Sequence, residues 1–322
     1  HSYSSAASDV YKRQGQARCG SRTGRLDGRS RSTMINGGTA LVGLLGNPVR
    51  HSLSPAMHNA ALAELGLNWR YLALPCEQLH LRDVLDGLHA VGCRGLNVTI
   101  PHKQAVAGLC RKLSPLACRL GAVNTLIPDS GSSWTGSNTD VNGFLAPLET
   151  HIDWTGRRAV VVGCGGSARA VVAGLQTLHL AAISVIGRQT TTLQPFVQDL
   201  NLEEAPLDPL LDSDPSIADV VAASDLIVNT TPVGMAQHGE AGAMPLGESL
   251  WSGIKTEATL YDLIYTPRPT AWLQWGRKRQ LHCIDGLEML VQQGAASLRL
   301  WSGHDDVPVD AMRSAAETAL KA

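Results

Sequence analysis

The sequence predicts an α/β protein of two domains, and three observations support this prediction. The chain of 322 residues exceeds one typical domain, and its composition, 44% hydrophobic and 17% charged, is that of a globular protein. Strand-like and helix-like segments alternate from Leu41 onward. Near Arg158 a buried-strand pattern enters a glycine-rich turn, which restarts the alternation as a second unit.

In the first half, strands are expected from residue 41, at 69–74 and at 95–100. A turn at 46–48 precedes a helix over 55–65 that Gly66 closes, and another helix is expected around 79–91. Residues 121–134 contain two strand-like runs around a Pro-Asp-Ser-Gly turn, which predicts a β-hairpin.

In the second half, a strand over 158–163 leads through the glycines into an apolar helix that reaches residue 178. Further strands are expected at 183–186, 225–229 and 259–263. The Pro- and Asp-rich stretch 203–215 is expected to be a surface loop.

Charge and cysteine content exclude several classes of protein. The first 33 residues hold seven of the 27 Lys and Arg side chains and two of the 28 Asp and Glu, so the remainder is acidic and has no footprint for nucleic acid. Seven cysteines without a metal-like spacing indicate free thiols in a reducing compartment, with no disulfide framework and no zinc. The most apolar stretch, 168–187, contains charged and polar residues and is a poor membrane span.

The Arg- and Ser-rich segment 1–33 is expected to be a disordered leader. Its high content of Arg and Ser also resembles that of a transit peptide. We favour translated upstream or expression-derived sequence, with the natural start at Met34, because the folded pattern begins directly after this residue.

The segment Asn-Val-Thr-Ile-Pro-His-Lys, residues 97–103, places polar side chains and a lysine at one corner of the predicted fold. Pro101 suits the first position of a helix, so Lys103 is expected in the first turn. A cation there opposes the positive end of the helix dipole, where a carboxylate would be more stabilising. This misplaced charge indicates a role in proton transfer, although most lysines simply extend into solvent.

The glycine-rich turn at 163–167 approximates a dinucleotide fingerprint, in which absent side chains let a pyrophosphate approach a helix N-terminus. The next strand ends at 187–189 without an acidic residue to accept a hydrogen bond from a ribose 2′-hydroxyl. Arg188 can instead bind a 2′-phosphate, which favours NADP over NAD. A tight turn followed by a surface arginine is the alternative.

Two serines and an aspartate are further candidates for a site. Ser54 precedes Pro55 and makes a good N-cap, whereas Ser52 has no such structural role. Asp140 lies near the start of a helix expected through Phe144, so capping and chemistry explain it equally well.

A series of short motifs follows along the chain: G-N-P-V-R-H-S-L-S-P-A-M-H-N, N-V-T-I-P-H-K, G-A-V-N-T, N-T-D-V-N-G, G-C-G-G-S-A-R, N-T-T-P-V-G-M, Y-D-L-I-Y-T-P and D-G-L-E-M-L-V-Q-Q-G-A. In content and order this series resembles that of the shikimate dehydrogenase family, over nearly all of residues 34–303. No single motif is specific, whereas the whole series is.

The resemblance implies a role for each matching residue. Lys103 and Asp140 match the catalytic pair of the family. The positions matching the substrate site are Ser52, Ser54, Asn97, Thr99, Asn124, Thr139, Tyr265 and Gln293. The positions matching the NADP site are Gly163, Cys164, Gly165, Gly166, Ser167, Gly187, Arg188, Gln189, Leu263 and Gly286.

The implied activity is the reversible NADPH-dependent reduction of 3-dehydroshikimate to shikimate, in the pathway to chorismate and the aromatic amino acids. Such chemistry requires one general acid or base beside the reacting oxygen and no metal, and Lys103 suits that task with Asp140 as its partner. Three positions depart from the usual family pattern. Residues 187–189 read Gly-Arg-Gln instead of Asn-Arg-Thr, Ser167 replaces a common alanine, and Glu288 replaces a common glycine and is expected to face solvent.

The implied architecture is an N-terminal α/β substrate domain, 34–139 plus 286–322, and a Rossmann-type NADP-binding domain, 140–285, with the site in the cleft between them. The protein is expected to be cytoplasmic, with a small-molecule substrate and no nucleic-acid or membrane partner, and a homodimer is left open. Two alternatives remain. One is a quinate/shikimate dehydrogenase of broader substrate or cofactor choice, and the other is a non-catalytic shikimate-binding regulator.

Overall fold

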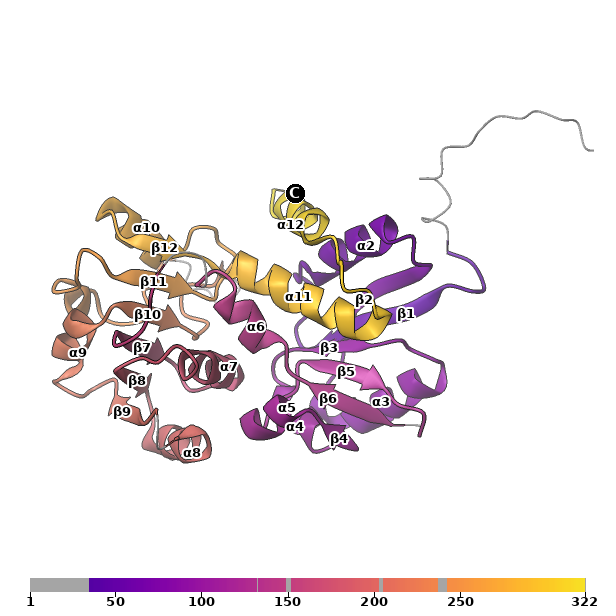
Figure 1. Ribbon diagram of the computed structural model, residues 1–322, viewed down its shortest axis with the longest axis horizontal. Helices are drawn as coiled ribbons and strands as arrows, with labels where there is room; N and C mark the ends of the chain where they lie inside the picture. Colours follow the sequence, from indigo (N-terminus) through magenta and orange to yellow (C-terminus); the bar gives the residue numbers. More distant parts are fainter. Residues whose placement is uncertain (1–34, 132, 149–151, 203–204, 237–241, 322) are drawn as a thin grey trace, which may run out of the picture. The chain divides into compact units, whose positions relative to one another are not determined.

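The computed structural model describes residues 35–131, 133–148, 152–202, 205–236 and 242–321, so the expected leader lies outside the described residues. These residues form one compact unit that contains two six-stranded sheets (Figure 1).

The first sheet has the strand order β2-β1-β3-β5-β6-β4. Its strands are β1 (Ala40–Gly46), β2 (Trp69–Pro75), β3 (Leu96–Val98), β4 (Lys112–Leu113), β5 (Thr125–Pro128) and β6 (Trp134–Ser137). β1 pairs in parallel with β2 and β3, whereas β5 and β6 form the predicted antiparallel hairpin. The hairpin extends the sheet because β5 also pairs antiparallel with β3.

Apolar cores cover both faces of the first sheet. The helical segments that follow its strands are α2 (Ser54–Glu64), η1 (Gln78–His80), α3 (Leu81–Ala90), α4 (Lys103–Ala107) and α5 (Pro115–Leu120). One core joins β1 to α2, and the other joins the opposite side of β1 and β3 to α3, α4 and α5. Successive residues of β1 therefore contribute to different cores, as the period of a strand dictates, with Leu44 in one and Leu45 in the other.

The second sheet is wholly parallel, in the order β12-β11-β10-β7-β8-β9. Its strands are β7 (Arg158–Val162), β8 (Ala182–Gly187), β9 (Leu207–Leu211), β10 (Leu226–Asn229), β11 (Thr259–Asp262) and β12 (His282–Ile284). Its helices are α6 (Asp140–Leu145), α7 (Gly166–Leu175), α8 (Thr190–Leu200), α9 (Ile217–Ala223), η3 (Glu248–Trp251) and α10 (Ala271–Lys278). This is the doubly wound Rossmann order, whose switch point lies between β7 and β10, so the Rossmann prediction is confirmed.

Two local predictions are wrong. The expected surface loop at 203–215 contains β9, which tolerates Pro209 because it is an edge strand and pairs only with β8. Pro101 is not the first helical residue. It follows a cis peptide bond, and α4 begins two residues later at Lys103, which still occupies the first turn.

Two C-terminal helices return to the first sheet. They are α11 (Gly286–Ser302) and α12 (Val309–Ala319), drawn in yellow in Figure 1. α11 contacts α6, α2 and β5, and both helices pack into the core that contains β1 and α2. The first half of the fold is therefore completed by the end of the chain.

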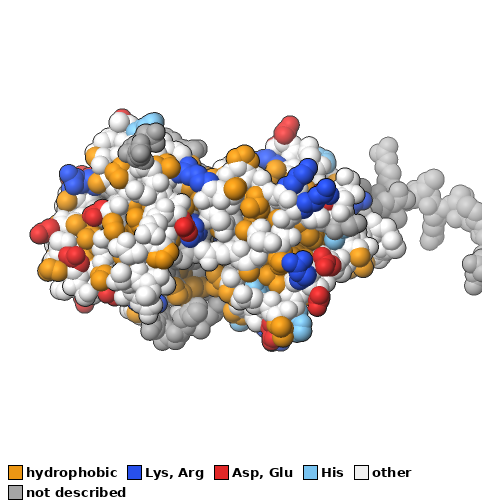
Figure 2. All heavy atoms as spheres, turned by 90° about the horizontal axis from the view of Figure 1, so that it is seen from below, with side chains coloured by type: hydrophobic (Ala, Val, Ile, Leu, Met, Phe, Trp, Pro, Cys, Tyr) orange, Lys and Arg blue, Asp and Glu red, His pale blue; other side chains and the backbone are white. Residues whose placement is uncertain are grey.

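The surface does not separate into acidic and basic regions on the face that Figure 2 shows, where the two kinds of side chain are interspersed. Within the described part of the chain no helix is long and apolar enough to cross a membrane. The cysteines described, at 76, 93, 110, 118, 164 and 283, are free thiols.

Candidate active site

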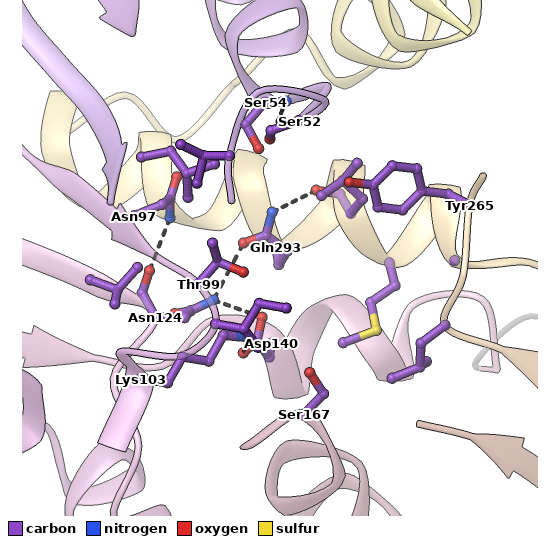
Figure 3. A pocket seen from close by; sticks show the side chains of 18 of the residues that line it. Ser52, Ser54, Asn97, Thr99, Lys103, Asn124, Asp140, Ser167, Tyr265 and Gln293 are labelled. Atoms are coloured by element: carbon purple, nitrogen blue, oxygen red, sulfur yellow. Dashed lines mark hydrogen bonds and ion pairs between the residues drawn. The ribbon is translucent and has the colours of Figure 1, made fainter. Parts of the chain in front are cut away.

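A cavity of about 440 Å³ is lined by residues from both halves of the fold. It contains most of the residues predicted for the substrate and for catalysis, which Figure 3 labels: Ser52, Ser54, Asn97, Thr99, Lys103, Asn124, Asp140, Tyr265 and Gln293. Of the residues predicted for the cofactor, Ser167, Leu263 and Gly286 also line it. We call this cavity the central pocket.

Lys103 and Asp140 form an ion pair in the central pocket. Lys103 Nζ donates to Asp140 Oδ2 at 2.8 Å, and the two side chains are only 12% and 7% exposed. Lys103 begins the five-residue helix α4 and Asp140 begins α6, so two helix starts bring the pair together. The Asp140 carboxylate therefore pairs with Lys103. The N-cap of α6 is Thr139, whose side chain forms no capping hydrogen bond.

Asn124 anchors the other oxygen of the carboxylate. Its Nδ2 donates to Asp140 Oδ1 at 2.8 Å, and its Oδ1 accepts from the Thr139 backbone N–H at 2.8 Å. Gln293 Oε1 lies 3.3 Å from the same Nδ2. Asp140 is therefore held from both sides, by Lys103 and by an amide that is itself fixed.

The N-cap predicted at Ser54 is wrong, because Leu53 holds that position and no side chain caps the helix. The Ser54 N–H donates to Ser52 Oγ at 3.2 Å, so Ser52 has a structural contact after all, and Ser54 is already the first residue of α2. Behind Ser54, the buried His58 ring donates from Nδ1 to the Ser54 carbonyl at 2.9 Å. Burial lowers the pKa of His58 to about 4, so this ring is neutral at physiological pH.

Asn97 lines the central pocket although it is almost fully buried, whereas Thr139 does not line it. Asn97 is 4% exposed and its amide bonds with Tyr71 OH at 2.8 Å and Ser297 Oγ at 2.8 Å. Thr139 is also 4% exposed, and among the described residues it is not part of the pocket lining. Both side chains belong to one buried polar network, which reaches the central pocket at Asn97.

Three members of this network, Tyr71, Thr125 and Ser297, are not among the predicted site residues. Tyr71 and Thr125 are fully buried within strands, and Ser297 is fully buried within α11. Thr125 ends the G-A-V-N-T motif, which could have identified it, whereas Tyr71 and Ser297 look like ordinary residues of a strand and a helix.

The glycine loop has the features that a dinucleotide needs. Gly163 has a φ of +107°, and a side chain there would approach Thr230 Oγ1 to 2.6 Å, so glycine is required where β7 meets the loop after β10. A side chain at Gly165 would meet nothing within 4 Å, which leaves open space in front of the loop. α7 starts at Gly166 without a side-chain cap, so its first N–H groups are available to an anion.

The remaining predicted cofactor residues lie near this loop. Cys164 Sγ is 3.7 Å from Thr192 Oγ1 in the first turn of α8, and Gly187 ends the neighbouring strand β8. Arg188 and Gln189 are exposed directly after that strand. A cationic side chain therefore follows the second strand of the Rossmann unit, the place at which such folds distinguish a 2′-phosphate from a 2′-hydroxyl.

Asp262 organises the loops on the cofactor side of the central pocket. Its carboxylate is 1% exposed and accepts from Asn229 Nδ2 at 3.0 Å, Thr270 Oγ1 at 2.7 Å and the Ile264 N–H at 3.2 Å. Burial raises the pKa of Asp262 to about 6, although these hydrogen bonds oppose the shift. The neighbouring residue Leu263 lies against the start of α11. Its carbonyl group leaves no room for a side chain at Gly286, so glycine is required there.

Glu288 does not simply face solvent, contrary to the prediction. Its Oε2 accepts from Arg313 Nε at 2.8 Å, and its Oε1 accepts from Gln292 Nε2 at 2.8 Å. The side chain lies on the face of α11 away from the central pocket and ties α11 to α12.

Comparisons with known proteins agree on one family. The model of the shikimate dehydrogenase substrate binding domain matches residues 44–126, and that of the shikimate 5'-dehydrogenase C-terminal domain matches residues 286–317. A shikimate dehydrogenase (NADP(+)) from Synechocystis is 48% identical over 287 residues, which cover 87% of this chain and 96% of the relative.

Solved structures give the same result. The shikimate 5-dehydrogenase of Thermus thermophilus in complex with NADP(H) and shikimate is 33% identical, with a TM-score of 0.75 and coverage of 87% of this chain and 99% of that one. The quinate dehydrogenase of Corynebacterium glutamicum in complex with NAD is 30% identical, with a TM-score of 0.76 and coverage of 87% of this chain and 99% of that one.

Proposed function

The chain belongs to the shikimate dehydrogenase family, and from this premise we propose that it interconverts 3-dehydroshikimate and shikimate with NADP as its cofactor. It is thus an oxidoreductase that acts on a CH–OH group. The observation that carries the proposal is the Lys103–Asp140 ion pair, which places one proton-transfer group in a pocket otherwise rich in neutral polar side chains.

In the direction of reduction, the Lys103 ammonium donates a proton to the ketone oxygen, and in the direction of oxidation its amine removes the proton of the hydroxyl. Asp140 fixes the lysine at 2.8 Å and presents a second hydrogen-bonding group to the same oxygen. Asn124 prevents the carboxylate from turning, because it holds Oδ1. The substrate oxygen thus meets a positioned donor and acceptor, and the chain needs no metal for this proton transfer.

The rest of the substrate is recognised by neutral groups. We assign the carboxylate to the hydroxyls of Ser52 and Ser54, and the ring hydroxyls to Thr99, Asn124 and Gln293, which all line the central pocket. Many fixed neutral partners suit a polyhydroxylated ring, because each substrate hydroxyl needs both a donor and an acceptor. Tyr265 lies across the pocket from Lys103 and closes this side (Figure 3).

NADP, when bound, supplies or accepts the hydride. The open glycine loop and the uncapped start of α7 suit its pyrophosphate, and Arg188 suits its 2′-phosphate. Leu263, Gly286 and Met289 form an apolar side of the central pocket where a nicotinamide would exclude water from the reacting atoms.

A quinate/shikimate dehydrogenase is the second candidate, because a quinate dehydrogenase bound to NAD is among the similar structures. Two features of this chain favour shikimate and NADP. Both pocket serines are present, and a basic rather than an acidic residue follows β8. A non-catalytic regulator is less well supported, because binding alone does not require a buried lysine and aspartate in contact.

The test is the absorbance of reduced nicotinamide with purified protein, crossing shikimate and quinate with NADP and NAD. We expect rapid reduction only with shikimate and NADP. Comparable rates with quinate or NAD would assign the broader enzyme. No reduction with any pair, in folded protein that still binds shikimate, would leave the regulator.

We also propose that 34–139 with 286–322 forms the substrate domain and 140–285 the NADP-binding domain. The strand orders of the two sheets and the return of α11 to the first core support this division. The free thiols support a reducing, cytoplasmic location, which cell fractionation tests. A homodimer is tested by light scattering, and a single mass near 34 kDa would contradict it.

A further inference from the structure

Ser297 lies at the centre of the buried polar network beneath the central pocket. Its side chain is 0% exposed, and its Oγ is 2.8 Å from Asn97 Nδ2, 2.8 Å from Thr125 Oγ1 and 3.1 Å from Thr139 Oγ1. Its Oγ also lies 3.0 Å from the Gln293 carbonyl, the ordinary contact of a serine within a helix, so its one proton can go either to this carbonyl or to Thr125. The three further contacts join α11 to strands β3 and β5 and to the start of α6.

The directions of these hydrogen bonds determine how the Asn124 amide is oriented. Asn124 Oδ1 can only accept, and it does so from the Thr139 N–H and from Thr125 Oγ1, each at 2.8 Å. Its Nδ2 can only donate, and it faces Asp140 Oδ1 at 2.8 Å. A reversed amide would set its oxygen against the Asp140 carboxylate, two acceptors in contact.

The Thr125 hydroxyl that serves Asn124 is itself held by Ser297 Oγ at 2.8 Å and, at the longer distance of 3.4 Å, by Asn97 Nδ2. Thr125 carries one proton, and when this proton goes to Asn124, Thr125 Oγ1 accepts at its 2.8 Å contact with Ser297, whose one proton then goes to Thr125 and not to the Gln293 carbonyl. Bulk solvent does not reach either hydroxyl, because both residues are 0% exposed. The rotation of the Thr125 hydroxyl is therefore set by Ser297, one residue further from the pocket.

We propose that Ser297 and Thr125 form a positioning pair, which holds the Asn124 amide so that Asp140 and Lys103 keep their catalytic geometry. The proposal rests on the proposed dehydrogenase function. Neither hydroxyl lines the central pocket among the described residues, so the pair acts through Asn124 and touches no substrate. It also explains why a helix whose neighbouring positions are apolar carries a buried hydroxyl here.

The first test compares Ser297→Ala with Ser302→Ala. Ser302 is a matched control, because it lies on the same helix and its Oγ donates to the Leu298 carbonyl at 2.7 Å, the same contact without the network. We expect Ser297→Ala to lower kcat for shikimate oxidation roughly tenfold, the effect of about 1.4 kcal/mol, while KM for NADP stays within about twofold. Ser302→Ala should keep both constants within about twofold of the wild type.

A second pair keeps the proposal testable if Ser297→Ala folds poorly. Thr125→Val removes the hydroxyl at nearly constant shape, whereas Thr125→Ser keeps it and loses a methyl group. We expect Thr125→Val to lower kcat as Ser297→Ala does, and Thr125→Ser to keep most of the activity. The double variant Ser297→Ala/Thr125→Val should be no slower than the slower single variant, because both act on one amide.

Three results would overturn the positioning pair while the wild type remains active: wild-type kcat in Ser297→Ala, equal kcat in Thr125→Val and Thr125→Ser, or additive losses in the double variant. An increase in KM for NADP with unchanged kcat would also overturn it, since the pair does not contact the cofactor side. A wild type that does not oxidise shikimate at all would instead contradict the proposed function, and the positioning pair with it.

Discussion

Lys103 is the one lysine or arginine among the described residues that line the central pocket. Lys103→Ala should lower kcat by about 10²- to 10⁴-fold, because no other side chain of the pocket can supply the proton from the same position. The affinity for shikimate should change only a few fold, since neutral groups make most of the contacts. Steady-state kinetics and calorimetric binding measure the two effects.

The control for this variant is Lys112→Ala, at an exposed lysine in β4. It should leave both constants unchanged. If Lys103→Ala turned over at the wild-type rate, the lysine would have no part in the proton transfer, and another group would have to be found.

Arg188 is exposed directly after β8, where a 2′-phosphate would lie. Arg188→Ala should raise KM for NADP about tenfold or more and leave KM for NAD nearly unchanged, because charge-assisted hydrogen bonds to phosphate are among the stronger ones. Arg82→Ala, at an exposed arginine of α3, is the control. Equal changes for both cofactors would mean that Arg188 does not recognise the phosphate.

At the level of single residues, the sequence predicts what lines the pocket better than what supports it. Lys103 and Asp140 could be identified because their positions and motifs are unusual, and the structure brings them into contact. The contact of Ser52 with the Ser54 N–H and the place of Ser54 inside α2 could not be predicted, since both depend on where α2 begins. The contact between Thr125 of β5 and Ser297 of α11 could not be predicted either, because these residues lie 172 positions apart in the chain.

Helices α6 and α11 approach each other closely at Gly143. A side chain there would lie 2.7 Å from the Met289 carbonyl and 2.8 Å from Gln293 Cβ. Gly143→Ala should therefore push α6, which carries Asp140, away from α11, which carries Gln293, and lower kcat/KM for shikimate by at least about tenfold. The measurement is steady-state kinetics together with a thermal melt.

Gly87→Ala in α3 is the matched control for this substitution. A side chain at Gly87 meets nothing within 4 Å, so alanine should leave kcat/KM unchanged and stabilise the helix by about 1 kcal/mol. A Gly143→Ala variant with full activity would show that the two helices can separate without disturbing the pocket.

The loops that follow β10 and β11 depend on the Asp262 carboxylate. Its pKa is about 6 in the folded protein and near the ordinary value of 3.8 when unfolded, so between these values the folded state binds the proton more tightly. The contribution of this group to the free energy of unfolding therefore falls as pH rises from about 4 to 6 and is constant above that range.

The test is urea denaturation of the wild type and of Asp262→Asn from pH 4.5 to 7.5. Over this pH range the free energy of unfolding of Asp262→Asn relative to the wild type should rise by about 2 kcal/mol and level off above about pH 6. A constant offset from the hydrogen bonds to Thr270 and Asn229 does not alter this slope. A difference that is independent of pH would mean that Asp262 ionises normally in the folded protein.

At the level of elements, hydrophobic periodicity predicts most strands and helices. The prediction fails at two prolines, because proline is compatible with more than one local structure. Proline in a stretch with Asp reads as a loop, yet Pro209 lies in an edge strand whose outer side needs no N–H partner. Pro101 reads as a helix start, yet the helix begins only at Lys103. In both cases the tertiary neighbours decide, and they are absent from the local pattern.

The whole molecule depends on its last two helices. Met312 of α12 is 0% exposed in the core shared by β1, α2 and α11. Met312→Ala should lower the free energy of unfolding by about 2–4 kcal/mol, through the loss of buried apolar surface and the cavity left behind. Chemical denaturation measures this, with the exposed Thr318→Ala of the same helix as the control.

KM for shikimate should remain near the wild-type value in Met312→Ala under conditions where the variant is folded, because Met312 does not line the central pocket. A raised KM without loss of stability would instead mean that α12 adjusts the pocket directly.

The order in which the chain is made conflicts with the order in which its first core can close. The face of the first sheet that packs against α2 is completed by Leu298 and Met312, which are translated after the whole second sheet. A nascent chain that ends before residue 286 therefore carries a first half with an open apolar face, whereas the parallel sheet behind it already has its strands. An arrested chain of that length should be cut by protease in its first half, and full protection there would contradict this. The part of the protein that leaves the ribosome first is thus the part that finishes folding last, and until then it is the part that a chaperone must shield.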